Sequence, residues 1–359
     1  MKKKLFGLLF CLVVISSLFV GCKKDTPTSK SGGKKIGVAM PTKDLQRWNQ
    51  DGENMKKQLE AAGYVVDLQY ANNEIATQVS QIENMITSKC DALVIASIDG
   101  GSLGTVLKEA KSSGIPVIAY DRLIMDTDAV SYYATFDNYM VGTIQGEYIV
   151  NQLDLKNAAG PFNIELFTGS PDDNNARFFF GGAMDILTPY IDSGKLVVVS
   201  GQKAFEEVAT LNWSTEEAQK RMENLITSNY AKGTKLDVVL SSNDSCAIGI
   251  SNALVAAGYT GSEFPILTGQ DCDIVSVKNI LAGTQSMSIF KDTRTLAAKV
   301  VEMVSAILKG ETVPVNDEKT YDNGTGIIPT YLCEPVFADS TNYKELLIDS
   351  GYYKEADLK

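Results

Sequence analysis

The chain has 359 residues, of which 44% are hydrophobic and 21% are charged, and this length and balance suit a soluble globular protein of two domains. Its formal net charge of −11 argues against a nucleic-acid partner, because phosphate binding needs a basic surface. The complete lack of histidine excludes Ser-His-Asp and Cys-His catalytic sets and removes the commonest metal ligand. We therefore expect no cofactor and no metal site.

The first 22 residues have the pattern of an export signal. Three lysines precede an apolar run from Leu5 to Val20, which is short for a membrane span and is interrupted by two serines. The run ends in "LFVGC", which resembles a bacterial lipobox, although Phe19 stands where leucine is usual. We predict cleavage before Cys22, lipidation of that cysteine and a flexible tether over residues 23–34. The protein would then be held at the outer face of the cytoplasmic membrane or lie in the periplasm. An ordinary signal peptide with a chance cysteine is the alternative.

From residue 35 onward, short apolar segments alternate with amphipathic ones. Strands are predicted at 35–40, 64–71, 91–97, 115–120, 132–136, 162–167, 195–200, 236–241, 265–269 and 286–290. Helices are predicted at 49–63, 75–88, 102–114, 138–153, 214–229, 246–258, 273–283 and 293–310. Apolar strands that alternate with helices predict parallel sheets covered on both faces. The number of strands favours two doubly wound α/β lobes over one open sheet, with a barrel as the alternative. The hydrophilic segment "YDNGTGIIPTY" suits a crossing between lobes.

Polar side chains gather where the predicted strands end. In parallel sheets, ligands bind beyond the carboxyl ends of the strands, so these side chains are candidates for one binding site. The densest cluster, from Asp172 to Arg177, has five polar groups at a single strand-to-helix junction. The candidates are Arg47, Trp48, Asp121, Arg122, Asp173, Asn175, Arg177, Trp213, Asn243, Asp271 and Lys291.

Helix capping is the main alternative for several of these positions, because Asp and Asn are preferred N-caps. Capping would account for Asn138, Asp244 and Asp292, and in part for Asp172. It does not account for an arginine after Asp121, for a lysine at a strand end, or for five polar groups where two would suffice.

The candidate side chains match the chemistry of a monosaccharide. Carboxylates accept hydrogen bonds from hydroxyls, Arg and Lys donate them, and Asn does either. The apolar faces of a sugar ring need flat partners, which Trp48 and Trp213 supply. No GxGxxG or GxxxxGK[ST] loop is present for phosphates. We therefore predict a site for a small polyol.

Four cysteines lie in the body of the chain, namely Cys90, Cys246, Cys272 and Cys333. They form no CxxC pair and no zinc pattern. Separate buried thiols are the favoured interpretation, and a disulfide is the alternative open to an exported protein.

Nine ordered stretches resemble the periplasmic sugar-binding proteins of ABC transporters, in the group that binds xylose, ribose, galactose or multiple sugars. They are "LQRWNQDGENM", "TQVSQIENMI", "DALVIASIDG", "IPVIAYDRLI", "YYATFDN", "GSPDDNNA", "SSNDSCAIG", "GQDCDI" and "GTQSMSIFKD". The resemblance implies a type I binding-protein fold, in which two lobes are joined by three crossings. It places the first lobe at 35–138 plus 291–326 and the second at 139–290 plus 327–359.

The resemblance also implies roles for matched residues. Arg47, Trp48, Asp121 and Arg122 would contact the sugar from the first lobe. Asp173, Asn175, Asn243 and Asp271 would contact it from the second, with Lys291 at a crossing. Trp213 lies where this chain departs from the xylose-binding pattern, and Arg177 is shared unevenly among relatives.

The function implied is that of a lipid-anchored receptor that binds an aldopentose or aldohexose, such as xylose, galactose or glucose, and delivers it to an ABC permease. The alternative is sugar input to a membrane histidine kinase. A glycosidase is disfavoured, because carboxylates interleaved with Arg and Lys favour stable ionisation over a raised pKa. A DNA-binding regulator of similar fold is disfavoured by the export signal and the acidic charge.

Overall fold

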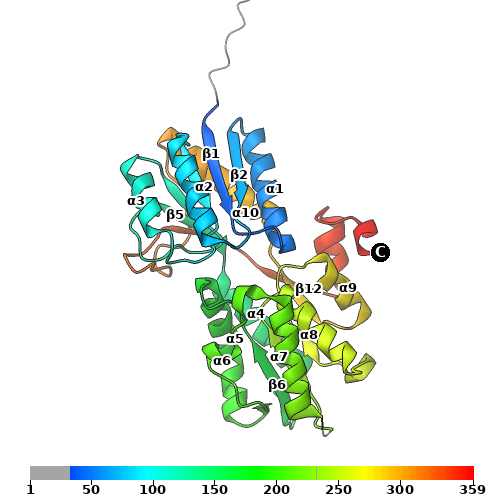
Figure 1. The fold of residues 1–359 in the computed structure, drawn as a ribbon. Coiled ribbons are helices and arrows are strands. Elements are labelled where there is room, and N and C mark those ends of the chain that lie inside the picture. Colours follow the sequence, from blue (N-terminus) through cyan, green and yellow to red (C-terminus); the bar gives the residue numbers. More distant parts are fainter. Residues whose placement is uncertain (1–32, 232) are drawn as a thin grey trace, which may run out of the picture. The chain divides into compact units, whose positions relative to one another are not determined.

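A computed structural model of the chain describes residues 33–231 and 233–359. The predicted export signal, Cys22 and nearly all of the predicted tether lie outside the described residues. The part that is described contains two large parallel sheets, each with helices on both of its faces, and a small antiparallel pair of strands (Figure 1). None of the helices in this part combines the length and the apolar character that a membrane span requires.

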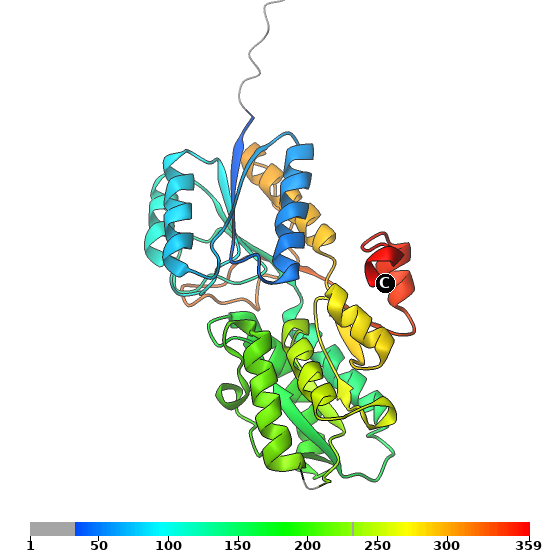
Figure 2. The ribbon, with the colours of Figure 1, turned by 45° about the vertical axis from the view of Figure 1, so that its right-hand side comes forward.

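The first sheet has six parallel strands in the order β11-β5-β4-β3-β1-β2. Its strands are β1 (Lys35–Met40), β2 (Val65–Tyr70), β3 (Ala92–Ile95), β4 (Val117–Tyr120), β5 (Tyr132–Phe136) and β11 (Thr330–Cys333). Its helices are α1 (Gln46–Ala61), α2 (Ile75–Thr87), α3 (Gly104–Ser112) and α10 (Thr293–Lys309). Helices α1 and α10 pack on one face and α2 and α3 on the other (Figure 2). Strands β3 and β4 are wholly buried, which explains their unbroken apolar sequence.

The second sheet has the parallel order β7-β6-β8-β9, which a bridge between Gln270 and Ile289 extends to an antiparallel pair, β10 and β12. Its strands are β6 (Phe162–Phe167), β7 (Leu196–Val198), β8 (Val238–Ser241), β9 (Ile266–Leu267), β10 (Met287–Phe290) and β12 (Val336–Asp339). Helices α4 (Asn138–Gln152) and α5 (Asn174–Asp192) pack on one face. Helices α7 (Thr215–Leu225) and α8 (Asp244–Ala256) pack on the other.

Shorter elements complete the second lobe. They are α6 (Phe205–Val208), α9 (Ile274–Ala282), the 3₁₀ turns η1 (Leu211–Trp213), η3 (Gly261–Glu263) and η5 (Glu355–Leu358), and the π-helical turns η2 (Ile226–Tyr230) and η4 (Lys344–Asp349). The predicted two-lobe arrangement is confirmed, and the barrel alternative is wrong. Strands β11 and β12 and the C-terminal turns were not expected from the sequence.

The chain passes between the lobes three times, and the third crossing corrects the expected boundary. The first two crossings follow β5 and β10. The expected second lobe began at residue 327, yet β11 pairs with β5 in the first sheet. The segment "YDNGTGIIPTY" is also held in the first lobe, because the Asn323 side chain donates to the carbonyls of Ile124 and Thr127. The third crossing therefore lies between β11 and β12.

The structure agrees with the predicted state of the cysteines but places two of the three predicted helix caps one residue earlier. All four cysteines of the body are buried and free, as the favoured interpretation had it. Asp292 caps its helix as expected, by accepting from the Arg294 amide. The caps of the other two helices are Asp137 and Asn243, one residue before the expected Asn138 and Asp244.

Helices α4 and α5 pack closely because glycines face the neighbouring backbone. A Cβ atom on Gly142 would lie 1.9 Å from the Phe179 carbonyl oxygen, and one on Gly182 would lie 2.1 Å from that of Tyr139. Gly181, on the same helix as Gly182, has only the Tyr139 ring within reach, at 3.7 Å. The contact therefore requires glycine at 142 and 182 but not at 181.

We expect Gly142→Ala to lower the free energy of unfolding by about 1–3 kcal/mol, because the added methyl group would clash with the backbone of α5 and push the two helices apart. Gly181→Ala is the control, and we expect it to be neutral or stabilising by up to about 1 kcal/mol, since alanine favours a helix over glycine. Urea denaturation of the three proteins measures both effects. Equal stability of Gly142→Ala and the parent chain would contradict the close packing.

Candidate functional site

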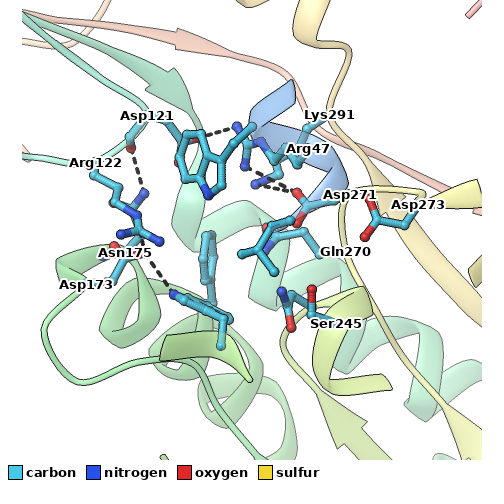
Figure 3. A pocket seen from close by; sticks show the side chains of 15 residues that line it. Arg47, Asp121, Arg122, Asp173, Asn175, Ser245, Gln270, Asp271, Asp273 and Lys291 are labelled. Carbon is cyan, nitrogen blue, oxygen red and sulfur yellow. Dashed lines mark hydrogen bonds and ion pairs between the residues drawn. The ribbon is translucent and has the colours of Figure 1, made fainter. Parts of the chain in front are cut away.

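A pocket lies between the two lobes, at the carboxyl ends of the strands. Ten of the eleven predicted residues line it, and they come from α1 and α5, from loops after β4, β6, β8 and β9, from η1 and from the second crossing (Figure 3). The predicted residues that line it are Arg47, Trp48, Asp121, Arg122, Asp173, Asn175, Trp213, Asn243, Asp271 and Lys291. Side chains more than two hundred positions apart in the chain thus meet in one small space.

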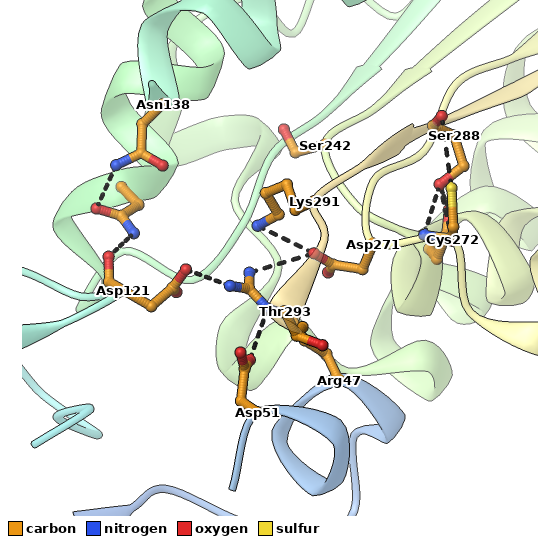
Figure 4. Close-up of polar contacts among 12 residues, drawn as sticks. Arg47, Asp51, Asp121, Asn138, Ser242, Asp271, Cys272, Ser288, Lys291 and Thr293 are labelled. Carbon is orange, nitrogen blue, oxygen red and sulfur yellow. Dashed lines mark hydrogen bonds and ion pairs between the residues drawn. The ribbon is translucent and has the colours of Figure 1, made fainter. Parts of the chain in front are cut away.

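Arg47, in the first turn of α1, lies among three carboxylates (Figure 4). Its Nε donates to Asp51 at 3.0 Å, its Nη2 pairs with Asp121, and its Nη1 donates to Asp271 of the second lobe at 3.2 Å. Burial acts to lower the pKa of Arg47, but the three carboxylates outweigh it and raise that pKa well above its ordinary value. Arg47 is therefore a fixed cation that joins the two lobes.

Asp51 was missed by sequence reasoning, because it lies inside a helix rather than at a strand end. Its side chain is fully buried, and it accepts from Arg47 and from the Tyr120 hydroxyl. Burial raises the pKa of Asp51 to about 6, against the opposing effect of Arg47. Asp51 stands four positions after Arg47 on the same helix, and this spacing could have predicted their ion pair.

Asp121 and Arg122 follow β4. Burial acts to raise the pKa of Asp121, but Arg47 and Lys291 overcome it and hold that pKa below the usual value. Arg122 donates from Nη1 to the Ser97 and Ile98 carbonyls, each at 3.1 Å, which aims its Nε across the cleft. That Nε lies 3.0 Å from the Asp173 carboxylate of the second lobe, so a second ion pair joins the lobes.

Asp173 is the N-cap of α5 and a pocket residue at once. Its Oδ1 accepts from the Asn175 amide at 3.0 Å, while its Oδ2 faces Arg122 and accepts from the Trp213 indole at 3.2 Å. Asn175 donates to the Asp121 carbonyl oxygen at 2.6 Å. The polar crowding after β6 therefore serves both capping and the pocket. Burial raises the pKa of Asp173, against the opposing effect of Arg122.

Asp271 and Lys291 meet at the floor of the site in the second lobe. Lys291 is 2% exposed, its Nζ lies 3.0 Å from Asp271, and the rings of Phe136 and Phe179 lie near that Nζ. Asp271 therefore has two cationic partners, Arg47 and Lys291. A fully buried lysine that ends a strand is costly unless it is paired in this way.

Arg177 does not belong to the pocket, so the prediction for this residue is wrong. Its side chain is exposed, lies over the Phe205 ring and pairs with Glu206 at 3.3 Å. It stands four positions after the cap, on the face of α5 that points away from the site. Helix periodicity from Asp173 onward does not by itself reveal which face meets the other lobe.

Five further residues line the pocket but were not predicted. They are Leu45, Phe179, Ser245, Gln270 and Asp273. Gln270 Oε1 and Asp273 Oδ1 are buried and have no hydrogen-bond partner among the described residues. Such acceptors are costly unless a donor reaches them. Burial, reinforced by Asp271, raises the pKa of Asp273 to about 7. Gln270 and Asp273 lie within two positions of Asp271 in "GQDCDI", and this proximity could have indicated that they line the pocket.

Three aromatic residues form the apolar part of the wall, namely Trp48, Phe179 and Trp213. Trp48 is flanked by the guanidinium groups of Arg47 and Arg122, at 5.4 and 5.1 Å from its ring. The Trp213 ring approaches Gly169 so closely that a Cβ atom there would lie 1.9 Å from it. The wall thus offers flat apolar faces between charged edges.

The arrangement can bind a small molecule that is rich in hydroxyl groups. It provides fixed cationic donors, carboxylate and amide acceptors and aromatic faces, all with little exposure. In the described part of the chain, no group of three His, Cys, Asp or Glu residues is placed to hold a metal ion.

Residues 36–312 match the family model described as "Periplasmic binding protein domain". The chain therefore belongs to the periplasmic binding protein family, as the resemblance predicted, and it has the type I fold of that family.

Two characterised relatives span almost the whole chain. The chain is 54% identical to the multiple sugar-binding periplasmic receptor ChvE of Rhizobium radiobacter over 90% of this chain and 92% of the relative. It is 39% identical to the D-xylose-binding periplasmic protein of Escherichia coli strain K12, with the same coverage of 90% and 92%.

A similar solved structure is an ABC transporter solute binding protein from Clostridium phytofermentans with bound β-D-glucose. Its sequence is 71% identical, its TM-score is 0.89, and the match covers 91% of this chain and 100% of the solved chain. The likeness therefore extends over both lobes.

The raised pKa values of Asp51 and Asp273 predict how stability depends on pH. Burial raises these pKa values from 3.8 to about 6 and about 7, so the folded protein holds protons that the unfolded chain has already released. Each acid contributes stability that is fully present below about pH 4 and is lost as the pH rises to about 6 or 7, by up to about 1.4 kcal/mol per pH unit.

We expect Asp273→Asn to remove its share of this loss, so that the variant gains stability relative to the parent chain between about pH 4 and pH 7. Urea denaturation at several pH values measures the difference. Parallel pH curves for the two proteins would show that Asp273 does not titrate in this range.

Proposed function

We propose that the protein is an extracytoplasmic solute receptor that binds a monosaccharide, an aldopentose or aldohexose such as xylose, galactose or glucose, in the pocket between its lobes. The observation that carries the proposal is the convergence of ten polar or aromatic side chains from both lobes on one pocket. The relatives named for multiple sugars and for D-xylose, and the solved structure with β-D-glucose, support this ligand class.

Each kind of side chain in the pocket can make a specific interaction with a pyranose. Arg47, Arg122 and Lys291 donate to hydroxyl or ring oxygens, and the carboxylates and Gln270 accept from hydroxyls. The unpartnered oxygens of Gln270 and Asp273 provide acceptors that the protein itself leaves unused. The indole faces of Trp48 and Trp213 suit the C–H faces of the ring.

Binding would be coupled to closure of the lobes. Neither lobe carries the whole set of partners, so a sugar gains its full set of hydrogen bonds only when the lobes meet. The interlobe ion pairs Arg47–Asp271 and Arg122–Asp173 indicate that the structure is a closed one. Exclusion of water on closure strengthens the polar bonds.

The closed receptor would deliver its sugar to an ABC permease. The solved structure from Clostridium phytofermentans, described as an ABC transporter solute binding protein, supports this partner. The export signal and the lipobox-like "LFVGC" support a lipid anchor at Cys22, which would keep the receptor near the membrane. A glycosidase role is disfavoured because Asp121 and Asp271 are bound to fixed cations, and release of product from an aryl glycoside would contradict this.

The ligand class predicts a selective thermal shift. We expect glucose, galactose or xylose to raise the melting temperature of the purified body of the chain, because a ligand that binds only the folded state stabilises it by about 2.7 kcal/mol at one hundred times its Kd. Nucleotides, amino acids and disaccharides are the comparison ligands. A panel in which no monosaccharide shifts the melting temperature would refute the proposal.

Asp173 and Arg177, four positions apart, make a matched pair of tests. Asp173→Asn retains the size and the cap of α5 but removes the charge, so we expect sugar affinity to fall by about 10- to 150-fold, as for loss of a charge-assisted hydrogen bond. Arg177→Ala, on the outer face of the same helix, is expected to leave affinity unchanged. Isothermal titration calorimetry measures both, and equal effects of the two changes would contradict the assignment of the site.

A further inference from the structure

The last seventeen residues form a segment that packs on the second lobe beside α9 (Figure 1). Leu347 of η4, and Tyr353 between η4 and η5, lie in an apolar cluster with Cys272, Val277 and Phe290. The segment is thus attached to the lobe that carries Asp271. Its tyrosines nevertheless reach α1, which belongs to the other lobe.

The Tyr353 hydroxyl makes three hydrogen bonds that involve both lobes. It accepts from Gln46 Nε2 at 2.7 Å and from Gln50 Nε2 at 2.9 Å, both on α1. It donates to the Cys272 carbonyl oxygen of the second lobe at 2.9 Å. A phenol offers one donor and two acceptor positions, so all of its capacity is used, and the side chain is only 6% exposed.

On the second lobe, this hydroxyl restrains the loop that presents Asp271. Asp271 and Cys272 have φ values of 99° and 52°, in the region that side chains other than glycine rarely adopt. Such a conformation persists only where the surroundings impose it. The Cys272 amide donates to Ser288 Oγ at 3.0 Å, and its carbonyl accepts from Tyr353, so both sides of this residue are held.

On the first lobe, the same hydroxyl holds the turn that carries Arg47. Gln46 directly precedes Arg47, and its Oε1 accepts from the Ile274 amide at 3.1 Å while its Nε2 donates to Tyr353. Gln50 lies one turn further along α1. Arg47 and Asp271, which pair across the cleft, are therefore tied together a second time behind the pocket.

We infer that Tyr353 is a positioning residue for ligand binding, which couples closure of the lobes to the placement of Asp271. It does not line the pocket, and it acts through the Cys272 carbonyl and through α1. Its hydrogen bonds to α1 form only when the lobes are closed, so the hydroxyl favours the closed, binding-competent state. The inference rests on the proposed monosaccharide function and adds a C-terminal residue to it.

The test is Tyr353→Phe in the whole body of the chain, which removes one oxygen and leaves the ring in the apolar cluster. We expect the Kd for the monosaccharide of largest thermal shift to rise by roughly 5- to 30-fold, mainly through faster dissociation, because the hydrogen bonds of one buried hydroxyl are lost. Tyr343→Phe is the control, because Tyr343 packs against the same apolar cluster but its hydroxyl is not a partner in the hydrogen bonds to α1 and Cys272, and we expect its Kd to equal that of the parent chain.

Two further measurements separate positioning from a loss of stability. Small-angle X-ray scattering of the ligand-free proteins should give a larger radius of gyration for Tyr353→Phe than for Tyr343→Phe, because the open state gains population. Gln46→Ala should weaken binding as well, and the double variant should be weakened by less than the product of the two single effects, since both changes break one contact.

The outcomes also separate this inference from the proposed function. If the parent chain binds no monosaccharide, the proposed function fails, and the scattering comparison still decides the role of Tyr353 in closure. If the parent chain binds and Tyr353→Phe binds equally well with unchanged scattering, the inference is overturned. Independent effects of Gln46→Ala and Tyr353→Phe would overturn it too.

Discussion

The site depends on one guanidinium group that three carboxylates share. Arg47 pairs with Asp51 and Asp121 of its own lobe and with Asp271 of the other, and all four side chains are nearly inaccessible to solvent. Burying such charges is costly unless each has partners of opposite sign at hydrogen-bonding distance. The pocket is therefore intact only when both lobes contribute, which ties the electrostatics of the site to the closed arrangement of the fold.

The backbone around the pocket shows the same constraint. Asp121, Trp213 and Asp271 all have positive φ, between 55° and 99°, although none is glycine. Backbone in this region costs of order 1–3 kcal/mol at each residue and persists only where the surrounding structure imposes it. Here the sharp turns aim one side chain each from a strand end or turn into the space between the sheets. The sheets and their helix layers hold these turns in place.

Several residues both cap a helix and line the pocket, so helix caps and pocket residues cannot be told apart by residue type. Asp173 and Asn243 cap α5 and α8 with one side-chain oxygen and face the pocket with the rest of the side chain. Asp244 lies next to a cap but is wholly buried, where it accepts from Gln285, Ser288 and the Asp273 amide. Burial raises the pKa of Asp244 well above its usual value, and its role is to support the loop rather than to face a ligand.

The sequence by itself determined the alternation of strands and helices, the two lobes and most of the pocket, because hydrophobic periodicity and polar residues at strand ends are local properties. Sequence also indicated the ligand class, since the candidates combine donors, acceptors and indoles. Only the tertiary structure decided that Arg177 points outward, that β11 returns to the first sheet, that Asp51 holds Arg47, and that Gln270 and Asp273 line the pocket. These features depend on which face of a helix meets the other lobe and on pairing between segments about two hundred residues apart. Local hydrophobic periodicity predicts neither of them.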